Sequence, residues 1–392
     1  MTAILAEPLS EVVAAAEKLL TRRTGAQVRL VDPVDLGGSG RTVVVRVRVA
    51  ENPFSLPRTL VIKQVRETSP KAPTAQRIEF DVPEHSTVDV AFLREAVSYQ
   101  FATALATESR PGAELLAYDF ETRLLVLGDL GDSAPFAALL KNADPDTVTN
   151  SLMAMAQALG RMHAATVGRE EDFTALLRRA EVAHCGDVVA EQAQASLDTV
   201  PDLLAERLGV EVPDEIRAIA GRAGKLFAGG RFRAFSPSDL CPDNIIVNDE
   251  GVRFLDYEWG GFRDATLDLA YALVSFPACL CSIHLSYERQ RAMTEAWRAE
   301  VVGMWPALAD DALLTERVLD AQLMWVWLST YLFLPEDYTR LAAVRDHQLS
   351  APRADALLAR WESLATFAEQ SGHDAIADHA TLVVARLRER IA

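Results

Sequence analysis

The chain has 392 residues, of which 49% are hydrophobic and 24% charged, a composition typical of a folded globular protein and not of a disordered or fibrous one. Its formal net charge of −17 argues against nucleic-acid binding, because neutralising phosphates requires a basic surface. An acidic surface would favour a cationic ligand, but solubility alone explains it in many proteins.

Neither a secretion signal nor a membrane span is predicted. The first residues lack a basic segment followed by an apolar one, and no run approaches the roughly 18 apolar residues that a span needs. Four cysteines are too few and too scattered for a disulfide scaffold and lack zinc-site spacing: Cys185, Cys241, Cys279 and Cys281. We therefore expect a cytoplasmic protein with reduced cysteines, and no membrane or protein partner is implied.

The first third of the chain is predicted to be rich in strands. An amphipathic helix is expected over 10–22, and strands over 43–49, where valines alternate with other residues, and 59–65. The polar stretch 66–88 indicates a loop. A glycine run precedes the first strand: Gly37, Gly38, Ser39 and Gly40.

Further along, a helix over 91–106 and strands over 113–119 and 123–127 are expected, followed by a mostly helical remainder with one hairpin at 244–256. This order predicts an α+β protein of two lobes. Its expected parts are an N-lobe over 1–127, a hinge over 128–131 and a helical C-lobe over 132–392.

The hairpin carries the most informative chemistry. The sequence NDEG over 248–251 is a strong turn signal, and a turn there pairs residues whose numbers sum to about 500. Asn244 and Asp256 satisfy that sum and should lie side by side, as a hard oxygen site suited to Mg²⁺. Asp239 lies five residues earlier, within reach of the same cavity. Taken alone, Asp239 and Asn244 would fit ordinary turn residues and Asp256 an exposed strand end. Together the three are typical of phosphoryl transfer.

These residues resemble a known family. DLCPDN over 239–244, then FLDYE over 254–258, is similar to the H-G-D-L-x-P-x-N and I-D-W-E patterns of the aminoglycoside phosphotransferase and choline kinase-like family. The segment 264–270 is similar to its G-D-P-x-x-D-L-A. The resemblance covers about 30–280 and implies a bilobal protein-kinase-like fold, with a small β-sheet N-lobe and a large, mostly helical C-lobe.

The resemblance also implies roles. Asp239 would accept or orient the proton of the acceptor hydroxyl, Asn244 and Asp256 would hold Mg²⁺ against the nucleotide phosphates, and Asp268 would brace the catalytic loop. Where the family has His-Gly before the aspartate, this chain has Pro237-Ser238. That difference affects loop geometry and rate more than reaction class.

Two charged residues in the N-lobe give independent support. Lys63 shares a strand face with two valines, and Glu95 lies on the apolar face of the helix marked by Phe92, Ala96 and Tyr99. Unpaired, each charge would be costly there, so we expect a Lys63–Glu95 ion pair. The alternative is that both are surface residues, with the aliphatic part of each side chain along the protein surface and the charged group in water. Kinase-like folds carry such a pair, and Lys63 would also reach the ATP phosphates.

The remaining nucleotide contacts follow from the resemblance. The glycine run over 37–40 would cover the phosphates, although glycine runs more often mark turns. The backbone at Gly128 and Leu130 would contact adenine. His163 is interpreted as structural, behind the catalytic loop.

We therefore expect an ATP- and Mg²⁺-dependent phosphotransferase that moves the γ-phosphoryl group to a hydroxyl of a small molecule, such as an antibiotic, a sugar or an amino alcohol. The alternative is a nucleotide-binding pseudokinase or scaffold with little turnover. Protein kinase activity is disfavoured, since no Phe-Gly follows Asp256. Glu258 and Asp264 would permit a cationic acceptor. Three aromatic residues on one later helix are read as core: Trp325, Trp327 and Tyr331.

Overall fold

The computed structural model describes most of the chain: residues 7–38, 42–51, 56–66, 86–182, 185–335 and 348–391. Ser39 and Gly40 of the glycine run, and most of the predicted loop 66–88, lie outside the described residues. Within the described ranges, no helix is long and apolar enough to cross a membrane.

The N-terminal part is one antiparallel sheet with a helix on each side. The strand order is β1-β2-β3-β5-β4. The elements are α1 (Glu7–Thr24), β1 (Arg29–Gly37), β2 (Thr42–Glu51), β3 (Thr59–Val65), α2 (Ser86–Thr103), β4 (Leu115–Asp119) and β5 (Leu124–Gly128).

The two faces of this sheet are buried differently. On the outer face, Leu60 and Ile62 of β3 join α1 in a small core. On the inner face, Val61 and Val65 pack against the large core that includes α2. Because side chains alternate along a strand, Lys63 lies on the inner face, toward the rest of the molecule.

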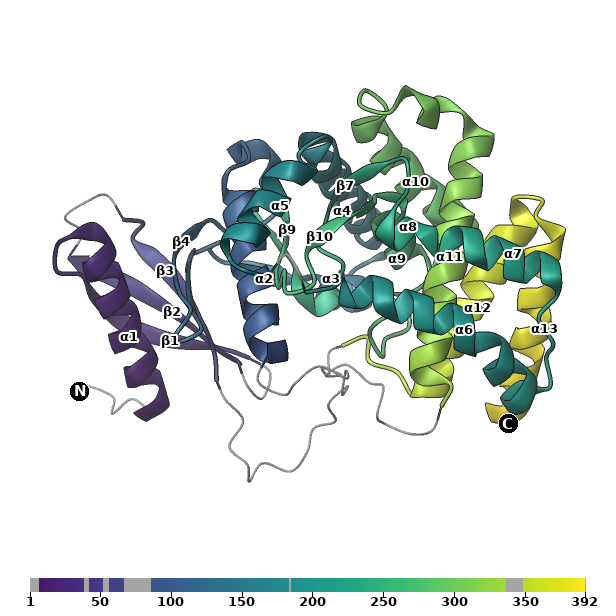
Figure 1. Cartoon of the computed structure of the whole chain (residues 1–392), viewed down its shortest axis with the longest axis horizontal. Helices are drawn as coiled ribbons and strands as arrows, with labels where there is room; N and C mark the ends of the chain where they lie inside the picture. The colour runs from purple at the N-terminus through teal and green to yellow at the C-terminus, as the bar shows by residue number, and fades with distance from the viewer. Residues whose placement is uncertain are drawn as a thin grey trace.

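Most of the remainder is helical, and α12 and α13 lie at the end of the molecule opposite α1 (Figure 1). The helices are α3 (Phe136–Asn142), α4 (Pro145–Thr166), α5 (Glu170–Arg179), α6 (Val188–Leu208), α7 (Asp214–Ala223), α8 (Lys225–Ala228), α9 (Thr266–Leu273), α10 (Tyr287–Val301), α11 (Asp311–Phe333), α12 (Arg353–Gln370) and α13 (Asp374–Ile391). Short 3-10 helices cover Thr107–Ser109, Pro242–Asn244 and Pro306–Ala309. The predicted bilobal α+β fold, with a small β-sheet lobe and a mostly helical remainder, is confirmed.

Sequence patterns missed several strands. The edge strand β1 carries Pro33 and is mostly exposed, so it lacks alternation. The C-lobe holds more than the one expected hairpin of β8 (Ile245–Asn248) and β9 (Gly251–Phe254), because β6 (Ala134–Pro135) pairs with β8, and β7 (Arg233–Ser236) pairs with β10 (Gly261–Asp264). Because the paired strands are distant in sequence, no local pattern predicts their pairing.

Several side-chain predictions are confirmed. Trp325 and Trp327 are buried in the core and Tyr331 packs against it. Each of the four cysteines has a thiol side chain that is not part of a disulfide, and Cys185 is half-buried while the other three are buried.

Candidate active site

Lys63 lies at the centre of the candidate site. Its Nζ donates hydrogen bonds to Glu95 Oε1 at 2.7 Å and to Asp256 Oδ1 at 2.6 Å. The predicted ion pair with Glu95 is thus confirmed. Although burial lowers the pKa of Lys63, the carboxylates of Asp256 and Glu95 raise it well above its usual value. Lys63 is therefore charged and joins the sheet, α2 and the end of the hairpin.

Helix α2 supports this junction with two side chains. Glu95 is 2% exposed, on the same face as the buried Phe92, Ala96 and Tyr99. The hydroxyl of Tyr99 accepts a hydrogen bond from the backbone N–H of Asp256 at 3.3 Å, and burial raises the pKa of Tyr99 above its ordinary value. The helix therefore holds both partners of the lysine.

The hairpin has nearly the predicted register. Ile245 pairs with Phe254 and Asn248 with Gly251, so paired numbers sum to 499 and not 500. The turn is centred between Asp249 and Glu250, which shifts the pairing by one. Consequently the Asn244 carbonyl accepts from the Leu255 N–H at 2.8 Å, and Asp256 is one residue beyond the position opposite Asn244.

Asp256 leaves the hairpin in an unusual conformation. Its φ is +62°, in the left-handed region that costs a non-glycine residue roughly 1 kcal/mol. The chain turns away from the strand at this residue, and the carboxylate meets Lys63. Such strain is common where a side chain must be aimed at a functional position.

The loop before the hairpin presents Asp239. Ser238 also has a left-handed φ, +64°, a backbone conformation that glycine adopts without strain. The Asp239 carboxylate accepts at Oδ1 from the Cys241 N–H at 3.2 Å. The side-chain amide of Asn244 donates to the Asp239 carbonyl at 3.4 Å, so the aspartate and the asparagine are tied together.

A buried polar network braces this loop from behind. Asp268 of α9 accepts from the Ser236 hydroxyl at 2.7 Å and contacts His163 Nε2 at 3.0 Å. The indole of Trp297 donates to His163 Nδ1 at 2.9 Å, so the proton of the neutral ring is on Nε2, which donates to Asp268. These contacts fit the structural interpretation of His163 and the bracing role expected of Asp268.

Negative charge dominates the surroundings of Lys63. Burial, the largest cause, raises the pKa of Asp239 to about 6, and the charges of Asp243 and Asp256 add to the effect. Burial and the Asp256 charge raise the pKa of Glu258 to about 8. A bound divalent cation would relieve this repulsion.

The oxygen donors present fit magnesium. Asn244 and Asp256 are 3% and 9% exposed and offer an amide and a carboxylate. In the described ranges, no three His, Cys, Asp or Glu side chains form a metal site by themselves. Protein-bound Mg²⁺ in phosphotransferases commonly uses one or two carboxylates together with substrate phosphates and waters, so this smaller donor set is sufficient.

The described part of the glycine run forms the start of the β1–β2 turn. Gly37 has φ +89°, and its N–H donates to Asp35 Oδ1 at 2.8 Å. A Cβ at Gly38 would lie 2.0 Å from the Thr42 carbonyl oxygen, so only glycine fits there. Contact with phosphates stays a prediction.

The expected hinge follows directly from the sheet. Gly128 ends β5, and its N–H donates to the Glu114 carbonyl at 2.8 Å. The Leu130 carbonyl accepts from Asn248 Nδ2 at 2.8 Å, which places the segment against the hairpin of β8 and β9. The adenine contacts and the boundaries of the lobes stay predictions.

Of the two acidic residues suggested for a cationic acceptor, Asp264 has a structural role. It is 0% exposed and accepts from the Thr266 hydroxyl at 2.7 Å and from the Phe232 N–H at 3.4 Å. Local sequence could not reveal this burial, because Asp264 lies on β10, one of the missed strands. Glu258 is partly exposed.

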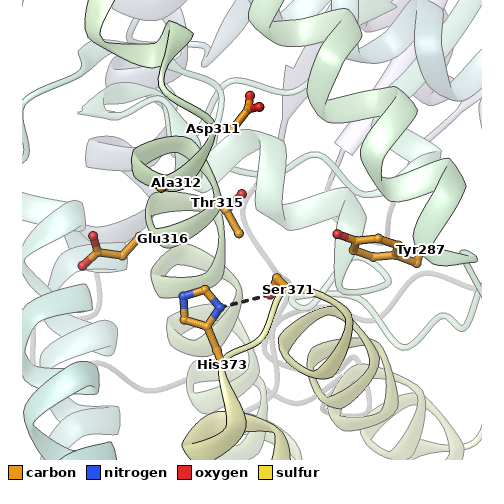
Figure 2. Close-up of a pocket in the computed structure, with 7 residues that line it drawn as sticks. All are labelled: Tyr287, Asp311, Ala312, Thr315, Glu316, Ser371 and His373. Carbon is orange, nitrogen blue, oxygen red and sulfur yellow. Dashed lines mark hydrogen bonds between the residues drawn. The ribbon is translucent and has the colours of Figure 1, made fainter.

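A surface pocket elsewhere contains none of these residues (Figure 2). It lies among α10, α11 and the turn after α12, where Ser371 and His373 are hydrogen-bonded at 3.2 Å. Its carboxylates already have partners, since Asp311 pairs with Arg298 and Glu316 with Arg222. This pocket therefore does not have the arrangement of residues that a second site for phosphoryl transfer would need.

Comparisons with known proteins give structural likeness at low identity. No family model and no curated protein matches the chain. A choline/ethanolamine kinase family protein from Mesorhizobium loti has a TM-score of 0.47 and 14% identity, covering 90% of this chain and 92% of that one. The choline kinase LicA from Streptococcus pneumoniae has 0.45 and 12%, covering 90% and 99%. An aminoglycoside phosphotransferase from Alicyclobacillus acidocaldarius has 0.44 and 13%, covering 95% and 98%.

Three contributors to the site were missed by sequence reasoning. The sequence patterns mark Tyr99 only as part of an apolar helix face, and they single out neither Ser236 nor Tyr271 of α9. Each acts through a hydrogen bond to a residue distant in sequence. The spacing of Tyr271 three residues after Asp268, on the same helix face, was the one available signal.

Proposed function

We propose that this protein is a phosphotransferase that binds Mg·ATP between its lobes and transfers the γ-phosphoryl group to a hydroxyl of a small molecule. The observation that carries the proposal is the buried contact of Lys63 with both Glu95 and Asp256, beside Asp239 and Asn244. Lysine, paired acids and an asparagine near one point are the parts that phosphoryl transfer requires.

Each residue has a physical task in this proposal. Lys63, fixed by Glu95, supplies positive charge to the α- and β-phosphates. Asn244 and Asp256 hold Mg²⁺, which neutralises charge on the phosphates when bound. Asp239 orients the acceptor hydroxyl and takes its proton, and a pKa of about 6 leaves it mostly ionised at neutral pH. The residues Gly37 to Gly40 cover the phosphates, and the backbone at Gly128 and Leu130 contacts adenine.

The test is a comparison of wild type with Asp239→Asn. Thermal-shift titration with Mg·ATP should give similar affinities, while phosphate release and transfer to a panel of aminoglycosides, other antibiotics, sugars and amino alcohols should fall by at least about 100-fold in the variant. Wild-type protein that neither binds nor turns over Mg·ATP would refute the proposal.

The second candidate is a nucleotide-binding pseudokinase, favoured by Pro237-Ser238 in place of His-Gly and by the left-handed Ser238. The same experiment separates the two. Tight Mg·ATP binding without turnover for any acceptor, water included, would identify a pseudokinase.

A further inference from the structure

Tyr271 lies on α9, and its side chain contacts Asp239 in the loop before the hairpin. Its hydroxyl donates to Asp239 Oδ1 at 3.3 Å, and the same oxygen accepts from the Cys241 N–H at 3.2 Å. The tyrosine is 0% exposed, on α9. One oxygen of the aspartate is therefore held from two sides.

The position of Tyr271 is itself fixed by its neighbours. Its ring meets the edge of Trp325 at a centroid distance of 4.9 Å, and its hydroxyl lies 3.3 Å from Cys241 Sγ. The indole of Trp325 donates to the Leu267 carbonyl at 2.7 Å, which fastens α9 to α11. Two packed helices thus set where the hydroxyl can point.

We propose that Tyr271 is a positioning residue for phosphoryl transfer: with the Cys241 amide it fixes Asp239 Oδ1, so that Oδ2 is presented to the acceptor hydroxyl. The inference rests on the proposed function, since it assumes that Asp239 orients the acceptor. A carboxylate held at one oxygen loses rotational freedom, which brings the other oxygen into reacting geometry more often.

The experiment uses Tyr271→Phe, with Tyr257→Phe as the matched control. Tyr257 is also 0% exposed, and within the described ranges its hydroxyl has no hydrogen-bond partner. The readout is turnover of Mg·ATP, with water or with the most active acceptor of the panel. For Tyr271→Phe we expect kcat to fall roughly tenfold while KM for ATP changes less than about twofold, because the nucleotide site is left intact. The control should match wild type.

The outcomes distinguish failure of the proposed function from failure of the role of Tyr271. Wild type that neither hydrolyses Mg·ATP nor transfers phosphate to any acceptor of the panel would refute the proposed function. Turnover by wild type with an unchanged kcat in Tyr271→Phe would overturn the role of Tyr271 and leave the proposed function standing. If Tyr271→Phe does not fold, Trp325→Phe, which removes the indole packed against the tyrosine, should lower kcat by a smaller factor with KM for ATP unchanged, and an unchanged kcat would overturn the inference.

Discussion

Replacing Lys63 by methionine should destabilise the protein in a pH-dependent way. The change leaves the carboxylates of Glu95 and Asp256 without the cation between them, and their side chains are only 2% and 11% exposed. Breaking a buried ion pair from one side costs about 3–5 kcal/mol. Protonating one carboxylate limits the loss, because each unit by which burial raises its pKa costs about 1.4 kcal/mol. We expect a loss of about 4 kcal/mol at pH 7.

The sign of the pH dependence follows from the same reasoning. In Lys63→Met the folded-state pKa of these carboxyls is raised above the unfolded value, so stability is retained at low pH and lost as pH rises. The loss should shrink to about 1 kcal/mol at pH 5. For a chain of this length unfolding as one unit, calorimetry should show midpoints lowered by about 5 °C at pH 7 and about 1 °C at pH 5.

The matched control is Lys141→Met on α3, since Lys141 is exposed and makes no ion pair among the described residues. Its midpoint should stay within about 1 °C of wild type at both pH values. A Lys63→Met variant as stable as wild type, or destabilised equally at pH 5 and pH 7, would show that the lysine does not neutralise the two buried carboxylates.

Three further predictions concern the loop and the hairpin. Because the pKa of Asp239 is about 6 and its ionised form is the active one, kcat for phosphate release should fall as pH drops through about 6; a flat profile from pH 5 to 8 would contradict this. Asp256→Asn should weaken Mg·ATP binding at least about tenfold in calorimetric titration, because a carboxylate ligand becomes neutral; unchanged affinity would remove Asp256 from the metal site. Ser238→Val should lower the free energy of unfolding by about 2 kcal/mol, while Ser238→Gly stays within about 1 kcal/mol of wild type, since only glycine tolerates a left-handed φ without strain; equal stabilities in urea titrations would contradict the backbone assignment.

Local chemistry made part of this site predictable from the sequence. The NDEG turn fixed the hairpin register to within one residue, because turn geometry dictates pairing. Lys63 and Glu95 carry opposite charges and each lies on an apolar face of its element. Because a charge there needs a partner, the sequence predicted their ion pair.

The remainder depends on contacts between distant segments. Pairing of β7 with β10 and the chain of contacts from Ser236 through Asp268 to His163 join residues far apart in sequence. The burial of Asp264 depends on the same strand pairing. Each of these residues reads locally as an ordinary turn, cap or helix position, and only packing of α4, α9 and the catalytic loop brings them together.

The most direct measurement is a crystal structure with Mg²⁺ and a non-hydrolysable ATP analogue. The account predicts that Lys63 contacts the α- and β-phosphates, that Asn244 and Asp256 bind the metal, and that Asp239 faces the γ-phosphate across an open acceptor position. A nucleotide bound away from Lys63, or a metal held without Asn244 and Asp256, would contradict it.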